Sequence, residues 1–282
     1  MVPLTSILAC IVTLCVSLVL PVLILILYAV RNKKQGIVSA WFLGAAGFFV
    51  PQMLVRLPVL NALSGTAWFT AFSQNHMFLY VFSLAATAGL FELAGRFAVA
   101  KILEKKLTYQ RALAAGLGHG GIEAIVIVGL TYVNNLIYIV MLNTGTFDVL
   151  GAQLAAAGQD PAMLDTIRQA LLGTSAGMFL LAGFERLLTM VLQAAMSMLV
   201  CWGVHTGKPG KAVLCCLGLH TLLDSTAGLS LLATEAGGNV LPQATVYLLI
   251  YTILVIAAGL SLAVMRSIRS RWLPETENGG KL

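Results

Sequence analysis

Long apolar stretches recur along almost the whole chain, and they restrict its fold more than any other feature of the sequence. A transmembrane helix needs about 20 predominantly apolar residues, because the hydrocarbon core of a bilayer is about 30 Å thick. Seven stretches reach this length, at about 4–30, 37–57, 76–103, 109–142, 173–204, 211–233 and 243–265. The sequence therefore predicts an all-α fold, a polytopic membrane helix bundle with about seven transmembrane helices.

Polar sequence is too scarce for a separate soluble domain. Only 10% of the 282 residues are charged, whereas ordinary soluble domains have roughly 25%. We therefore expect a single integral membrane domain over residues 1–282, with a motif-bearing core at about 76–233 and a polar cytoplasmic tail at 267–282. In the connection at 143–172, a short surface helix is predicted from Pro161 to Leu172.

The charge of the connections alternates along the chain, and this alternation predicts the topology. The second connection is uncharged, and the fourth and sixth carry mainly acidic residues, including Asp148, Asp160, Asp165 and Glu235. Basic residues dominate the others, namely Arg31, Lys33, Lys34, Lys101, Lys105, Lys106, Arg111, Lys208, Lys211, Arg266, Arg269 and Arg271. The positive-inside rule then places the N-terminus outside and the C-terminus in the cytoplasm of a multi-pass cell-membrane protein.

The same distribution bears on partners. The net charge of +6 is explained by contact between basic connections and anionic lipid headgroups, so membrane lipid is an expected partner. There is no basic stripe with interleaved aromatic residues, and we therefore expect no nucleic-acid partner.

Three of the apolar stretches each carry two ionisable side chains four positions apart. The pairs are Glu92 and Arg96, His119 and Glu123, and His220 and Asp224. On a helix, residues four apart lie on one face, so each pair points in one direction. Because an ionisable group in hydrocarbon costs at least a few kcal/mol, such faces turn toward the bundle interior. We therefore expect one shared polar pocket.

Depth in the membrane supports this expectation. At about 1.5 Å per residue, Glu92, His119 and His220 all lie roughly 14–17 Å from the cytoplasmic ends of their spans. Glu123 and Asp224 lie about one turn deeper. The sequence thus predicts a cavity that is lined by the third, fourth and sixth spans and opens toward the cytoplasm.

Other buried charges are interpreted as structural. Arg56 belongs to this group, and so do Glu185 and Arg186, whose side chains leave a helix about 100° apart and are not expected to pair with each other. Around His119, four glycines predict either close approach of neighbouring helices or access of a peptide or water to His119. Because glycine weakens a helix, they also predict a local helix break. They are Gly116, Gly118, Gly120 and Gly121.

These motifs, together with Phe184-Glu185-Arg186, resemble those of the YhfC family of intramembrane metalloproteases from about Leu90 to Thr226. That family is similar to the CAAX prenyl protease and bacteriocin-processing group and to the PrsW proteases. In the resemblance, Glu92 with Arg96 matches the first motif, His119 or Glu123 the second, and His220 with Asp224 the last. The chain departs from the relatives at Phe91-Glu92, where they carry two acidic residues.

The resemblance implies an intramembrane endopeptidase that hydrolyses a membrane-associated protein or peptide. Glu92 would activate a water molecule, and His119 and His220 would either bind a metal or polarise the carbonyl group. Catalytic zinc takes three protein ligands, so a Zn²⁺ cofactor would need His119, His220 and either Glu123 or Asp224.

Two other functions fit the same residues. Buried Glu, His, Asp and Arg side chains also serve in an ion- or proton-coupled secondary transporter. Alternatively, the polar cluster is a hydrogen-bonded scaffold, in which the Glu92–Arg96 pair only joins helices. Cleavage of a helical peptide by the purified protein would support the peptidase, and gradient-dependent uptake into liposomes would support the transporter.

Overall fold

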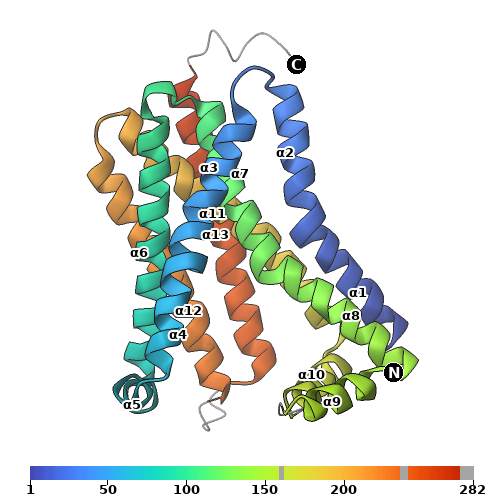
Figure 1. Cartoon of the computed structure of the whole chain (residues 1–282). Coiled ribbons are helices and arrows are strands. Elements are labelled where there is room, and N and C mark those ends of the chain that lie inside the picture. The colour runs from blue at the N-terminus through green and yellow to red at the C-terminus, as the bar shows by residue number, and fades with distance from the viewer. Residues whose placement is uncertain (159–161, 236–240, 274–282) are drawn as a thin grey trace. The chain divides into compact units, whose positions relative to one another are not determined.

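The computed structural model describes residues 1–158, 162–235 and 241–273, and all regular structure in these ranges is helical (Figure 1). Seven helices in this part of the chain are long and apolar enough to cross a membrane, which confirms the predicted polytopic helical fold. The spans are Leu4–Arg31, Ile37–Ser64, Met77–Lys106, Tyr109–Thr144, Ala176–His205, Pro209–Ser230 and Gln243–Trp272. Large apolar side chains such as Leu248 and Leu260 are exposed, as expected of helices that face lipid.

The spans are built from the following helical segments. The first comprises α1 (Leu4–Leu14), η1 (Cys15–Val19) and α2 (Leu20–Arg31), the second α3 (Ile37–Phe49), η2 (Val50–Arg56) and α4 (Leu57–Ser64), and the third α6 (Met77–Leu103) with η3 (Glu104–Lys106). The fourth comprises α7 (Tyr109–Ala124), η4 (Ile125–Gly129) and α8 (Leu130–Thr144), and the last three are α11 (Ala176–His205), α12 (Pro209–Glu235) and α13 (Gln243–Trp272).

Three spans contain a π-helical segment, in η1, η2 and η4. In η2 the cause lies in the sequence, because Pro51 has no backbone N–H to continue the α-helical ladder. Segments of this kind are frequent at functional sites. Here η2 carries Gln52 and Arg56, and η4 directly follows the helix that carries Glu123.

The connections contain more helix than the sequence predicted. Residues 58–75 were expected as a connection, but α4 continues to Ser64 and α5 (Ala67–Asn75) follows. The predicted surface helix is confirmed as α10 (Ala162–Gly173), whereas α9 (Phe147–Ala156) was not predicted, although its alanines favour helix. Asp160, Pro161 and the part of the predicted tail at 274–282 lie outside the described residues.

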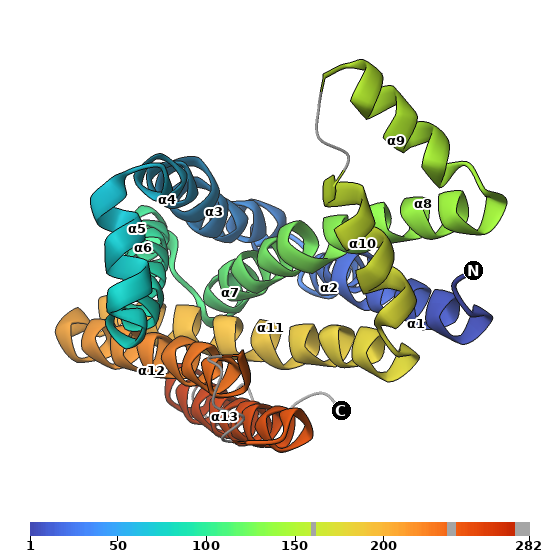
Figure 2. The same cartoon turned by 90° about the horizontal axis from the view of Figure 1, so that it is seen from below.

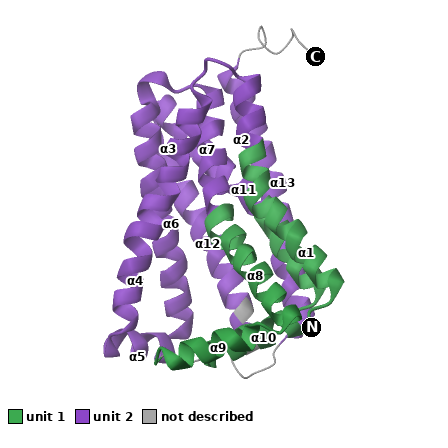
Figure 3. Ribbon diagram, turned by 45° about the vertical axis from the view of Figure 1, so that its right-hand side comes forward, with its two compact units in different colours: residues 1–23, 124–187 green, residues 24–123, 188–282 purple. Residues whose placement is uncertain are grey.

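The chain forms two compact units (Figure 3). Unit 1, residues 1–23 and 124–187, contains α1 packed along α8. Its apolar core includes Cys10, Tyr132 and Ile139. The Phe179 carbonyl accepts hydrogen bonds from Thr13 Oγ1 at 2.6 Å and from Tyr132 Oη at 3.2 Å. Polar side chains in this unit therefore help to join three spans.

One sequence prediction about unit 1 is wrong. Glu185 and Arg186 do pair, through Glu185 Oε1 and Arg186 Nη2. Their Cβ atoms diverge as neighbours on a helix must, but both side chains are long and flexible enough for their ends to meet over the helix surface. Divergence at the backbone does not prevent contact between the charged groups.

Unit 2, residues 24–123 and 188–282, contains all three polar pairs with a spacing of four that the sequence predicted to share a pocket. Within it α6 lies between α3 and α12, and α12 also packs against α13 (Figure 2). The apolar core of this unit includes Leu93, Val200 and Cys216.

Glycines bring the helices of unit 2 into backbone contact. A Cβ atom on Gly118 would overlap the carbonyl of Trp41 in α3, and one on Gly116 would overlap the backbone of Ala194 in α11. The predicted close approach around His119 is therefore confirmed. The predicted helix break is wrong, because α7 is continuous to Ala124, and the π-helical turn begins only at Ile125.

Candidate functional site

Five ionisable side chains meet in the interior of unit 2, although each of them lies in an apolar stretch of the sequence. Glu92 and Arg96 come from α6, His119 and Glu123 from α7, and His220 from α12. Each of them is at most 8% exposed. Burial of this kind requires partners, because an uncompensated buried charge costs several kcal/mol.

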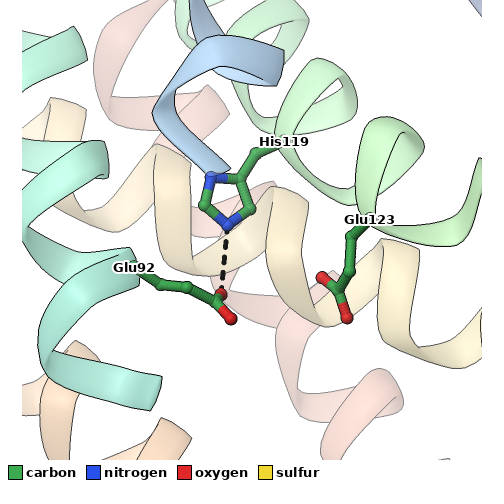
Figure 4. Close-up of side chains that lie close together, drawn as sticks. All are labelled: Glu92, His119 and Glu123. Atoms are coloured by element: carbon green, nitrogen blue, oxygen red, sulfur yellow. Dashed lines mark hydrogen bonds and ion pairs between the residues drawn. The ribbon is translucent and has the colours of Figure 1, made fainter. Parts of the chain in front are cut away.

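The Glu92 carboxylate lies at the centre of this cluster, and four side chains donate to it. Its Oε2 atom accepts from Arg96 Nη2 at 2.9 Å and from Gln193 Nε2 at 3.3 Å. It also lies 3.1 Å from Nε2 of His119, which donates to it in the tautomer that carries the proton on this nitrogen (Figure 4). Its Oε1 atom accepts from Gln52 Nε2 at 2.8 Å. An ionised carboxylate has about four acceptor positions, so these donors match a Glu92 that is charged.

Glu123 joins the cluster from the next turn of α7. Gln193 Nε2 donates to its Oε2 atom. The closest ligand atoms of Glu92, His119 and Glu123 all lie within 4.8 Å of one another, and Figure 4 shows the three side chains directed toward a common region. One imidazole nitrogen and two carboxylate oxygens are a donor set that suits a divalent metal such as zinc.

His220 lies on the other side of Glu92. Its Nδ1 atom is 3.7 Å from Glu92 Oε2, and its Nε2 atom is 3.2 Å from Asp224 Oδ2. Asp224 is 47% exposed at its side chain, so it contacts the cluster through His220 and lies at the edge. A carboxylate that binds the far nitrogen of a histidine fixes the orientation and tautomer of the ring.

Two glutamines in the cluster were not identified from the sequence. Gln52 and Gln193 are each 5% exposed and bond directly to Glu92. Gln193 also accepts at Oε1 from Arg96 Nη2. The signal in the sequence was a neutral amide in the middle of an apolar span. This signal is weaker than that of a charged residue, but a buried amide also needs a hydrogen-bond partner.

Arg56 contacts the cluster indirectly, through Gln52. It donates from Nη1 to Gln52 Oε1 at 3.3 Å and from Nη2 to the Leu84 carbonyl at 2.7 Å. Because Gln52 in turn donates to Glu92, Arg56 fixes which way the Gln52 amide points. The structural role that the sequence suggested for Arg56 agrees with these contacts.

A small cavity borders the cluster. Arg96, His119, Ser197 and Cys201 are among the residues that line it, and it has about 10 Å³ of room for the centre of a water molecule. This volume accommodates about one water molecule.

The fold and the site together define a multi-pass membrane protein with a buried group of side chains that could hold a metal ion. The family model of the YhfC intramembrane metalloprotease matches residues 16–236, and the chain belongs to that family. It is 30% identical over 213 residues to the uncharacterized membrane protein YhfC of Bacillus subtilis (strain 168), a match that covers 75% of this chain and 80% of that protein. No solved structure matches the chain.

Proposed function

We propose that the protein is an intramembrane metallopeptidase that hydrolyses a peptide bond of a membrane-associated protein or peptide. The observation that carries the proposal is the convergence of Glu92, His119 and Glu123, whose ligand atoms lie within 4.8 Å of one another in a buried site. The family description agrees with this chemistry.

In this proposal Glu92, His119 and Glu123 hold a divalent metal, and zinc suits their nitrogen and oxygen donors best. A bound metal would supply a Lewis acid that activates water and polarises the scissile carbonyl. Arg96 donates to Glu92 and thereby keeps that carboxylate ionised and oriented. Gln52 does the same for the second carboxylate oxygen.

His220 is the proposed proton-transfer residue. Its Nε2–H group donates to Asp224, so Nδ1 is the nitrogen that accepts a proton, and this atom faces Glu92 at 3.7 Å. A proton removed from water near Glu92 can pass to His220 and then to the leaving amine. General acid–base transfer of this kind contributes about 10² to 10⁴ in rate.

The test compares His119→Ala and His220→Ala with the wild type, purified in detergent, by elemental analysis and by cleavage of a panel of single-span helical peptides. We expect stoichiometric metal in the wild type and cleavage that a chelator abolishes. His119→Ala should lose both metal and cleavage, whereas His220→Ala should retain metal and lose cleavage. A wild-type protein that neither binds metal nor cleaves any peptide would contradict the proposal.

A further inference from the structure

The side chain of Gln193 occupies a distinctive position between the two carboxylates of the candidate metal group. Its amide nitrogen donates to Glu92 Oε2 at 3.3 Å and to Glu123 Oε2, and its amide oxygen accepts from Arg96 Nη2. A primary amide has two N–H donors and one carbonyl acceptor. All three groups of Gln193 are used. This residue on α11 therefore links the carboxylate of Glu92 on α6 to that of Glu123 on α7.

Arg96 fixes the orientation of this amide. If the amide rotated by 180°, its NH₂ group would face the guanidinium of Arg96 and its oxygen would face two carboxylates. Both contacts would then be repulsive. The N–H donors of Gln193 are therefore held toward Glu92 and Glu123.

We propose that Gln193 is a positioning residue that sets the metal affinity of the site, because its N–H groups bind the same two carboxylate oxygens that a divalent cation would take as ligands. The amide draws the two carboxylates together and at the same time competes with the cation for them. This inference rests on the proposed metal site, and it concerns how strongly that site binds.

The decisive substitution is Gln193→Glu, which keeps the length of the side chain and the acceptor for Arg96 but replaces the N–H donors with an anionic oxygen. We expect the apparent Kd for Co²⁺, measured by its visible absorption, to fall, because the variant no longer has N–H groups that compete with the cation for Glu92 and Glu123. The change should be at least about tenfold, the lower end of the 10–100-fold range over which neighbours of metal ligands act on affinity. Gln52→Glu is the matched control, because Gln52 donates to Glu92 alone. In Gln52→Glu the apparent Kd for Co²⁺ should also fall, but the fold decrease should be less than one third of the fold decrease in Gln193→Glu.

Equal Co²⁺ affinities in Gln193→Glu and the wild type would overturn the assignment. So would equal tightening in the two variants, since added negative charge alone would then be the cause. Melting temperatures measured on the same preparations identify any variant that is not folded. If the wild type cleaves peptides in a chelator-sensitive way while Gln193→Glu binds Co²⁺ like the wild type, the proposed function stands and only the role of Gln193 fails.

A second and independent observation concerns the small cavity beside the cluster. Arg96 Nε and Nη1 and Ser197 Oγ are buried polar atoms with no hydrogen-bond partner among the described residues, and both side chains line this cavity. An unsatisfied buried polar atom costs about 1–3 kcal/mol. The cavity has room for about one water molecule, and the unpaired atoms of Arg96 and Ser197 supply the two or more partners that an internal water requires.

We infer that this cavity is an internal water site, in which one water molecule accepts from Arg96 and donates to Ser197. Because His119 also lines the cavity, this water lies next to two residues that bond Glu92. Microsecond X-ray footprinting tests the site, since it oxidises side chains beside bound water even where bulk solvent is excluded. Cys201 lines the cavity and is 2% exposed, whereas Cys216 is 0% exposed and does not line it.

We expect Cys201 to be oxidised at least about tenfold faster than Cys216. Ser197→Val, which fills the cavity and removes the acceptor, should slow the oxidation of Cys201 to the rate of Cys216. Equal rates for the two cysteines in the wild type would overturn the inference, whether or not the Ser197→Val variant folds.

Discussion

At the scale of single residues, Glu92 is the centre of the proposed site, because four side chains converge on its carboxylate. Arg96, His119, Gln52 and Gln193 all donate to its carboxylate. Three of these donors share Oε2, so a metal ion that binds this atom would have to displace or rearrange one of them. Oε1 accepts from Gln52 alone and keeps a second acceptor position.

Glu92→Gln tests the central carboxylate. Glutamine keeps the shape of the side chain but removes its charge, so cleavage should fall at least about 10²-fold. The variant should fold and melt at a lower temperature, because the buried Arg96 loses its ion pair and retains Gln193 as an acceptor. Cleavage and thermal melting measured on one preparation check both effects.

Glu104→Gln is the matched control, since Glu104 lies just beyond α6 in an exposed pair with Lys101. An exposed pair contributes about 0–1 kcal/mol, so this variant should behave like the wild type. A stable Glu92→Gln protein with undiminished cleavage would exclude Glu92 from the reaction and leave Glu123 as the essential carboxylate.

Asp224 is predicted to act through His220. Asp224→Ala removes the acceptor for His220 Nε2 and should lower cleavage by about 10–100-fold, while leaving the metal content unchanged. Asp224→Asn keeps an oxygen at that position and should restore most of the activity. Loss of metal in Asp224→Ala would show instead that Asp224 is a ligand.

At the scale of helices, small residues rather than charges bring the site together. α7 can lie against α3 and α11 only because Gly118 and Gly116 have no side chains at the contacts. These contacts decide how far His119 reaches from α7 toward Glu92 on α6. The π-helical segment η2 has a similar effect, since it places Gln52 against Glu92.

Gly118→Ala should therefore destabilise the protein by about 1–3 kcal/mol, because its Cβ atom would overlap the Trp41 carbonyl and force α3 and α7 apart. Gly218→Ala in α12 is the matched control, since no atom lies within 4 Å of its Cβ position. That change should be neutral or stabilising by up to about 1 kcal/mol. Thermal melting in detergent compares the two, and equal melting temperatures would refute the proposed contact.

At the scale of the whole molecule, the protein is a multi-pass membrane protein of the YhfC intramembrane metalloprotease family. Its orientation in the membrane is a prediction from the basic connections. The same prediction places the α6–α7 connection, with Lys105, Lys106 and Arg111, in the cytoplasm.

Labelling of single cysteines with an impermeant maleimide tests this topology in an otherwise cysteine-free protein. We expect Asp165→Cys to react in intact cells and Lys33→Cys to react only after the membrane is permeabilised. Both positions are exposed, so accessibility does not favour one of them. The reverse pattern would show that the N-terminus is cytoplasmic.

Several features of this protein could be predicted from the sequence alone, because they depend on properties that are local in the chain. Seven apolar stretches of sufficient length predict seven spans. The spacing of four between His119 and Glu123, or between His220 and Asp224, puts both members of a pair on one helix face. Equal depth then predicted that Glu92 and His220 are neighbours, and His220 Nδ1 lies 3.7 Å from Glu92 Oε2.

Other features depended on the tertiary structure, because they involve contacts between side chains that are far apart in the chain. Gln193 follows Glu92 by 101 positions, and no local pattern distinguishes an amide that bridges two carboxylates from one that bonds a backbone carbonyl. Glu185 and Arg186 pair through flexible side chains despite their divergent directions on the helix. The glycines around His119 were compatible with a break or with close packing, and only the positions of α3 and α11 decided for packing.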